Sequence, residues 1–184
     1  MSALVQAAQK ERWRERFGAG VACVISSRAD APGLVAAKAL GVATQVVDHQ
    51  QYTNRDAFDA ALQSAVDAYQ PTLVLLAGFM RILTPNFVAQ YTGRLINIHP
   101  SLLPSFVGLN THQRVMAAGC QFTGATVHRV SDGLDQGDIL AQAVVPVLAS
   151  DNAASLAARV LSQEHLLYPR AIRVLLQSGM LATA

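Results

Sequence analysis

Four short apolar runs, separated by helix-like segments, most constrain the fold of this chain. They are VACVIS (21–26), ATQVV (43–47), TLVLLA (72–77) and RLINI (94–98). Each run is apolar throughout and lacks the alternation of a strand that has one face in water. Strands of this kind are covered on both faces, so the pattern predicts an α/β chain with an open, mostly parallel twisted sheet and helices on both faces.

The segments between these runs predict helices with recognisable ends. Segment 30–41 has Asp30 as a candidate N-cap and Gly41 as its stop, and segment 53–69 begins at Thr53 or Asn54. The other expected elements are helices over 1–17, 84–92, 111–118 and 151–178, the last kinked at Pro169, and strands over 124–130 and 138–147. A length of 184 residues corresponds to a single domain, 1–184.

Composition excludes several classes of protein. Charged residues make up 14% of the chain against an average of about 25%, which argues against disorder. The net charge of +2 gives no support for a nucleic-acid or anionic-membrane partner. The longest apolar run, 73–80, is far shorter than the roughly 18 residues of a membrane span. Cys23 and Cys120, with no C-x-x-C, are expected to be free thiols in the cytoplasm.

The segment GRLINIHPSLLP (93–104) carries the first candidate site, Asn97 and His99. Ligands of open α/β sheets bind beyond the carboxyl ends of the strands, where this segment is expected. Residues two apart on a strand share a face, and Pro100 favours an extended His99. An amide donor beside an imidazole can act as oxyanion hole and general acid. The alternative is a pair of hydrogen-bonded polar residues without function, and the five histidines show no metal-ligand spacing.

The loop SDGLDQGD (131–138) carries the second candidate, Asp135. Its spacing does not fit an EF-hand calcium loop. Turn chemistry alone explains aspartate and glycine in such a segment, and it is the preferred reading for Asp132 and Asp138. Asp135 lies between Leu134 and a Gln-Gly pair, and both a catalytic role and a turn role stay open.

Glu164 is the third candidate. It falls on the apolar stripe of the last predicted helix, which is formed by Leu156, Val160, Leu167 and Ala171. A carboxylate on an apolar face is either partnered or directed at a ligand, because an unpaired buried charge is costly. A partly exposed helix edge is the alternative.

Several stretches together resemble the phosphoribosylglycinamide formyltransferase family of purine synthesis. They are LVLLAGFMRILTPNFVAQYTGRLINIHPSLLP, TGATVH, GLDQGDILAQ and RVLSQEHLLYP, within a collinear likeness from about residue 21 to 179. Other formyltransferases and formyltetrahydrofolate hydrolase share the Asn, His and Asp elements. The AGFMRIL and QEHxLYP stretches favour the glycinamide branch.

The resemblance implies transfer of a formyl group from 10-formyltetrahydrofolate, as co-substrate, to the amine of glycinamide ribonucleotide. The catalytic triad positions fall on Asn97, His99 and Asp135. Asn97 and protonated His99 would donate to the developing oxyanion, each such donor being worth about 3–4 kcal/mol of barrier. Asp135 would hold His99 protonated and relay a proton. No metal and no covalent enzyme intermediate is implied.

The resemblance also implies binding residues. Met80, Arg81, Ile82 and Leu83 would lie along the folate pterin pocket, and the loop that includes Asp132 would close its other side. Glu164 matches a carboxylate that contacts the nucleotide substrate, and Arg55 a basic position near the substrate or the folate tail. The implied partners are small molecules, without nucleic acid or membrane, and a homodimer is left open.

The start of the chain departs from the family, which opens with an apolar strand and a glycine-rich S-G-x-G-S-N turn that cradles phosphate. MSALVQAAQ matches the helix after that turn, so the first strand is expected to be missing. A misassigned start codon is favoured over true truncation, because a sheet without that strand leaves backbone groups unpaired. The missing phosphate site leaves a folate-binding chain without turnover as one alternative function. A hydrolase that uses the same triad with water as nucleophile is a second alternative.

Overall fold

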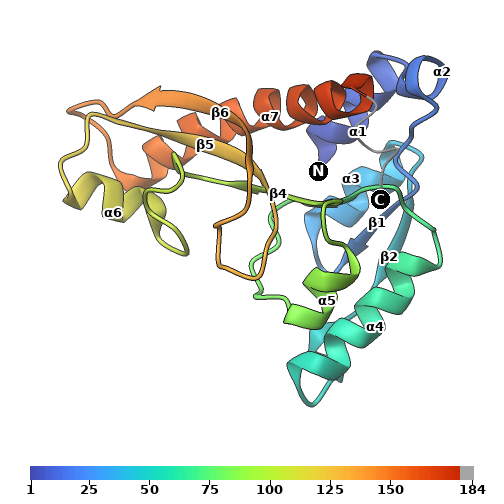
Figure 1. The fold of residues 1–184 in the computed structure, drawn as a ribbon. Helices are drawn as coiled ribbons and strands as arrows, with labels where there is room; N and C mark the ends of the chain where they lie inside the picture. Colours follow the sequence, from blue (N-terminus) through green and yellow to red (C-terminus); the bar gives the residue numbers. More distant parts are fainter. Residues whose placement is uncertain (179–184) are drawn as a thin grey trace.

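The computed structural model describes residues 1–178, which form helices packed against two groups of strands (Figure 1). The elements in chain order are α1 (Ser2–Lys10), α2 (Trp13–Phe17), β1 (Cys23–Ser26), α3 (Pro32–Ala39), β2 (Ala43–Val46), the 3₁₀ turn η1 (His49–Gln51), α4 (Arg55–Asp67), β3 (Val74–Leu76), α5 (Pro85–Gln90), β4 (Leu95–His99), α6 (Thr111–Ala117), β5 (Phe122–Arg129), β6 (Ile139–Pro146) and α7 (Ala153–Ser178). None of these helices is both long and apolar enough to cross a membrane.

The strands confirm the α/β class but form a mixed sheet system. β1 pairs with β2 and β3 with β4, both in parallel, whereas β4–β5 and β5–β6 are antiparallel. β5 and β6 are joined by a loop without a crossover helix, and such a connection can only produce an antiparallel pair. The strands also divide into two sheets, β1-β2 and β3-β4-β5-β6, in place of the single open sheet expected.

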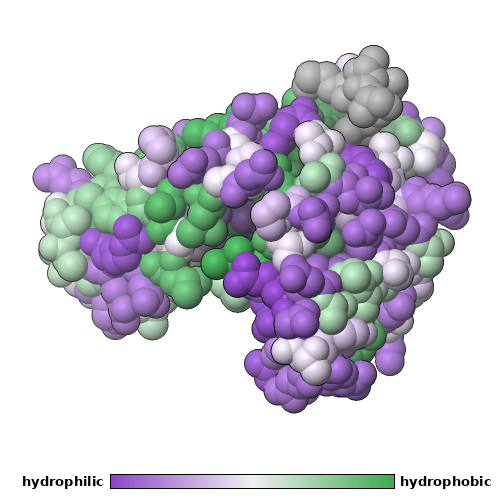
Figure 2. Space-filling view, turned by 60° about the horizontal axis from the view of Figure 1, so that its bottom comes forward, coloured by the Kyte–Doolittle hydropathy of each residue, from purple (hydrophilic) through white to green (hydrophobic). Residues whose placement is uncertain are grey.

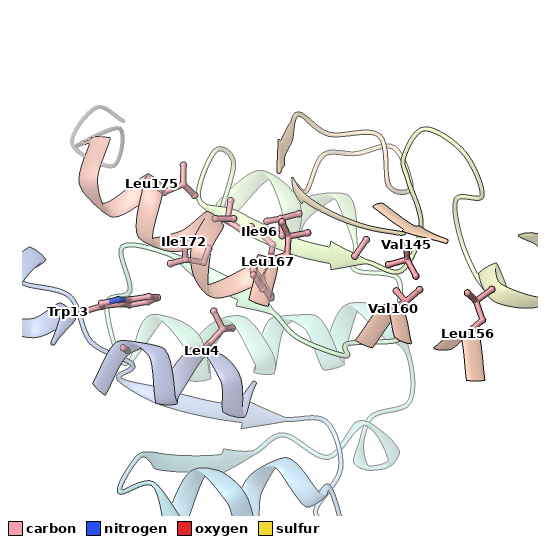
Figure 3. Packing of buried hydrophobic residues seen from close by; sticks show 14 of the residues in the cluster. Leu4, Trp13, Ile96, Val145, Leu156, Val160, Leu167, Ile172 and Leu175 are labelled. Carbon is pink, nitrogen blue, oxygen red and sulfur yellow. Dashed lines mark hydrogen bonds between the residues drawn. The ribbon is translucent and has the colours of Figure 1, made fainter. Parts of the chain in front are cut away.

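Helices cover both faces of β4, as predicted. On one face, α1 and α7 pack against Ile96 through a buried cluster that includes Leu4, Trp13, Leu167 and Ile172 (Figure 3). On the other face, α4 and α5 pack against Leu95 through a second cluster, whose buried members include Phe58, Leu62, Phe87 and Tyr91. Leu95 and Ile96 are both fully buried and point to opposite sides, so β4 is covered on both faces; in the sheet it lies between β3 and β5.

Three helix ends differ from the sequence prediction. The expected helix over 1–17 is two helices, because Arg12 adopts a left-handed conformation (φ 55°) and Trp13 then turns into the core. Asp30 does not cap α3; its carboxylate binds the Arg28 guanidinium at 2.6 Å instead. Asp151 does not open α7, because Asn152 Oδ1 accepts the first free N–H groups of that helix.

Other predicted helix features are confirmed. Asn54 caps α4 by accepting the N–H of Ala57, and Gly41 follows the end of α3 in a left-handed conformation (φ 74°). The predicted stripe of α7, Leu156, Val160, Leu167 and Ala171, is buried. The helix continues past Pro169 as one element, and the kink expected there stays a prediction. Glu164, which falls on the same stripe, is half-buried.

Candidate active site

Asn97 and His99 lie on one face of β4, close to its carboxyl end, as predicted. Antiparallel pairing sets Asn97 opposite His128 and His99 opposite Thr126, so four polar side chains share this face. Parallel pairing sets Leu76, the last residue of β3, beside Asn97. The segment that leaves β3 therefore emerges next to the same polar group.

Asp135 reaches this group from the loop between β5 and β6. The β5–β6 register shifts between Val127 and His128, a bulge that redirects the chain leaving β5. Gly137 then passes so close to β5 that an added Cβ would lie 1.8 Å from the carbonyl oxygen of Arg129. Asp135 itself has a left-handed conformation (φ 54°), and its side chain is 9% exposed.

His99 lies between two hydrogen-bond acceptors. Its Nδ1 is 3.2 Å from Asp135 Oδ2, and its Nε2 is 3.0 Å from the carbonyl oxygen of Phe106. Since a ring nitrogen can bind an acceptor only through an N–H, a doubly protonated imidazole satisfies both contacts. Asp135 Oδ2 also accepts the N–H of Gly108 at 2.9 Å, so the loop after β4 is tied to the loop after β5.

His128 is a fourth member of this group that sequence reasoning did not single out. Its Nε2 is 3.3 Å from Asn97 Nδ2 and 3.7 Å from Asp135 Oδ1, and its Nδ1 is 2.8 Å from the carbonyl oxygen of Arg129. The side chain is 1% exposed, and burial lowers the pKa of His128. A histidine within the apolar strand GATVHRV was the signal, but only the β4–β5 register places it beside Asn97.

The predicted folate segment, residues 80–83, connects β3 to α5. Met80 and Ile82 are 75% and 62% exposed, whereas Leu83 packs against the second cluster. The Arg81 guanidinium lies over the Phe58 ring, 5.3 Å from its centroid. Large exposed apolar side chains also occur in the two loops that meet at Asp135, and Figure 2 shows apolar surface gathered around a hollow on this side of the molecule.

The remaining predicted residues are Arg55, Asp132 and Glu164. Arg55 is the exposed first residue of α4, and Asp132 is exposed in the β5–β6 loop. Glu164 is half-buried on α7, and burial raises its pKa. It lies one turn before Tyr168, whose hydroxyl reaches the carbonyl oxygens of Leu76 and Ile96 at 3.0 and 2.9 Å. The amino group of Met1 is close enough to act on the Glu164 carboxyl and lowers its pKa, against the larger effect of burial.

The arrangement provides hydrogen-bond donors, a carboxylate and a proton-carrying imidazole in one place. Within residues 1–178, no group of three or more His, Cys, Asp or Glu side chains is arranged to hold a metal ion. Asn97 and His99 can donate to an oxygen that gains negative charge, and Asp135 can accept a proton or stabilise a charged His99. The site is therefore suited to acid–base chemistry at a carbonyl carbon.

Comparison with known proteins agrees with this chemistry. The formyl transferase family profile matches residues 1–172. The chain is 47% identical to the phosphoribosylglycinamide formyltransferase of Escherichia coli K12 over 83% of its own length and 72% of that protein. It is 44% identical to the bovine trifunctional purine biosynthetic protein adenosine-3, over 85% of this chain and 15% of that longer protein. The crystal structure of the Brucella melitensis phosphoribosylglycinamide formyltransferase is 48% identical, with a TM-score of 0.87, and the match covers 96% of this chain and 88% of that one.

Proposed function

This chain belongs to the phosphoribosylglycinamide formyltransferase family, and on that premise we propose how its site works. The reaction is formyl transfer to the amine of glycinamide ribonucleotide, a step of purine biosynthesis. We propose 10-formyltetrahydrofolate as the formyl donor and residues 1–184 as one catalytic domain. The observation that carries the proposal is the convergence of Asn97, His99 and Asp135 from two distant segments, with His99 Nδ1 3.2 Å from Asp135 Oδ2.

The reaction begins when the substrate amine attacks the formyl carbon, which forms a C–N bond and moves an electron pair onto the formyl oxygen. Asn97 and His99 donate hydrogen bonds to that oxygen. Each preorganised donor is typically worth about 3–4 kcal/mol of barrier. Collapse of the adduct breaks the bond between the carbon and the folate nitrogen, and Asp135 moves the proton lost by the amine toward that nitrogen.

His99 must exchange one of its hydrogen-bond partners before it can donate to the formyl oxygen. Both ring nitrogens already face acceptors, Asp135 on one side and the Phe106 carbonyl on the other. The Nε2–H becomes available to the oxyanion when the substrate takes the place of the Phe106 carbonyl. Asp135 meanwhile keeps Nδ1, so the ring stays charged and correctly turned during the exchange.

The binding roles rest on position. Met80, Arg81, Ile82 and Leu83 follow β3, whose last residue pairs with Asn97, and this position supports a role in holding the pterin ring. We assign Asp132, in the loop that also carries Asp135, to the other side of that pocket. Glu164, half-buried on α7 one turn before Tyr168, would bind the nucleotide substrate. Arg55, exposed at the start of α4, would bind an anionic group of the substrate or of the folate tail.

One assay tests the proposal against its alternatives. The chain is incubated with 10-formyltetrahydrofolate, with and without glycinamide ribonucleotide, and tetrahydrofolate release is followed. Release that depends on the acceptor supports the transferase. Equal release without the acceptor indicates a hydrolase, in which water replaces the amine. Folate binding without release indicates a binding protein, and either of these outcomes refutes the proposal.

A further inference from the structure

We propose that His128 is a positioning residue that presents the amide nitrogen of Asn97, and not its oxygen, to the reacting centre. The inference rests on the proposed function, because it assigns His128 a part in the same reaction. His128 and Asn97 are cross-strand partners on β5 and β4, and both are held by the sheet register. His128 therefore acts through Asn97 and needs no contact with the substrate.

The tautomer of His128 follows from its backbone partner. Nδ1 lies 2.8 Å from the carbonyl oxygen of Arg129, and a carbonyl oxygen can only accept a hydrogen bond. Nδ1 therefore carries the proton. In the neutral ring, Nε2 is then a bare acceptor buried in the site.

The orientation of Asn97 follows in turn. Nε2 of His128 lies 3.3 Å from the Asn97 amide, and an acceptor at this distance requires the amide nitrogen to face it. An amide nitrogen has two N–H groups. One donates to His128, and the second is free for the developing oxyanion. The opposite rotamer would place the amide oxygen beside Nε2, with two acceptors facing each other.

Neutrality of His128 matters because of the charges around it. Asp135 Oδ1 lies 3.7 Å from His128 Nε2 and would attract a proton to it, whereas the nearby His99 lowers the pKa of His128. A protonated His128 would draw the Asp135 carboxylate away from His99. Its new Nε2–H would also bind the amide oxygen of Asn97, which would turn the Asn97 amide around. Burial lowers the pKa of His128, which opposes that outcome.

Two substitutions separate this role from simple packing. His128→Asn retains a donor at the Nδ1 position for the Arg129 carbonyl but loses the acceptor for Asn97. His128→Gln retains an acceptor at the Nε2 position. We expect His128→Asn to lower kcat by about 10- to 100-fold, less than the roughly 10²–10³ for outright removal of an oxyanion donor. We expect His128→Gln to lose clearly less, with the KM for folate little changed in both.

A double-mutant cycle supplies the decisive comparison. In an Asn97→Ala background the amide is already gone, so His128→Asn should lower kcat by less than about threefold. An equal loss of kcat in both backgrounds, or a loss below threefold in the parent, would overturn the proposal.

A measurement on the unaltered protein keeps the test independent of turnover. Nitrogen-15 NMR of labelled histidine at pH 7 should show His128 neutral, with the proton on Nδ1. A ring that is charged, or protonated on Nε2, refutes the positioning role even if every variant fails to fold. If the parent lacks acceptor-dependent turnover, the proposed function fails, while the tautomer still decides whether His128 orients Asn97.

Discussion

Replacing Thr126 by valine tests how the segment after His99 is held in place. Thr126 is fully buried on β5. Its hydroxyl donates to the carbonyl oxygen of Ser101 at 2.7 Å and accepts from the N–H of Leu103 and the amide of Gln142, each at 3.0 Å. Valine has nearly the same shape but makes none of these bonds, so the substitution isolates the hydroxyl.

The expected loss of stability follows from the groups left without partners. Gln142 keeps its second bond, to the Leu103 carbonyl at 2.9 Å, so the loss falls on the Ser101 carbonyl and the Leu103 N–H. Both residues are buried. Each stranded group costs about 1–3 kcal/mol. The added methyl group recovers about 0.8 kcal/mol. We therefore expect Thr126→Val to lower the free energy of unfolding by about 3 kcal/mol.

The same strand offers a matched control. Thr123 is 2% exposed, and its hydroxyl has no hydrogen-bond partner. Thr123→Val should leave stability unchanged or raise it, because a buried unsatisfied hydroxyl is removed. Urea unfolding followed by fluorescence of Trp13, the single tryptophan, measures both variants. Equal losses of unfolding free energy in the two variants, or a loss below about 1 kcal/mol for Thr126→Val, would refute the role given to the Thr126 hydroxyl.

Three further predictions concern the site. His99→Ala should abolish formyl transfer while folate binding, measured by fluorescence titration, persists; turnover within about tenfold of the parent would contradict the role of His99 as an oxyanion donor. Asp135→Asn should remove most turnover and change the pH profile of kcat, because the carboxylate beside His99 Nδ1 is lost, and an unchanged profile would argue against the proton relay. Burial lowers the pKa of His128 and of His112, a residue of α6, below 6.5. At pH values between the lowered pKa values and 6.5, the unfolded chain therefore binds more protons than the folded chain. The stability these histidines contribute is complete above pH 6.5 and is lost as the pH falls through the lowered pKa values; urea midpoints should therefore fall from pH 7.5 to pH 5, by a smaller amount in His112→Gln, and equal midpoints would contradict this.

The strands were predictable because short, non-alternating apolar runs have few other uses in a chain of this kind. β3 and β4 lie within the predicted runs to within a few residues, and Asn97 and His99 share a face as the two-residue period requires. The capping of α4 by Asn54 was also a local signal. In each case the pattern that predicted the feature lies within the element itself.

The features that escaped prediction depend on distant contacts. Nothing local in TVHRV shows that His128 will face Asn97, because that contact depends on the register between two strands 31 positions apart. Aspartate is a common N-cap residue, but the carboxylates of Asp30 and Asp151 bind the guanidinium groups of Arg28 and Arg159 instead of a helix N–H. Hydrogen bonds between two charged groups are stronger than those to a neutral N–H.

The left-handed conformations in the two site loops have a common explanation. Phe106 (φ 57°) and Asp135 (φ 54°) both adopt a backbone region that costs a non-glycine residue about 1–2 kcal/mol. Glycine would relieve the strain at Asp135 but would remove the carboxylate that faces His99. The strain at Phe106 turns its carbonyl toward His99 while its ring packs against the main core and beneath Arg114. Because Gly108, two residues later, donates to Asp135, one short loop supplies a partner to His99 and to Asp135. In the proposed mechanism, a substrate that displaces the Phe106 carbonyl would move the same loop whose Gly108 N–H holds Asp135, so substrate entry and the orientation of the carboxylate would be coupled.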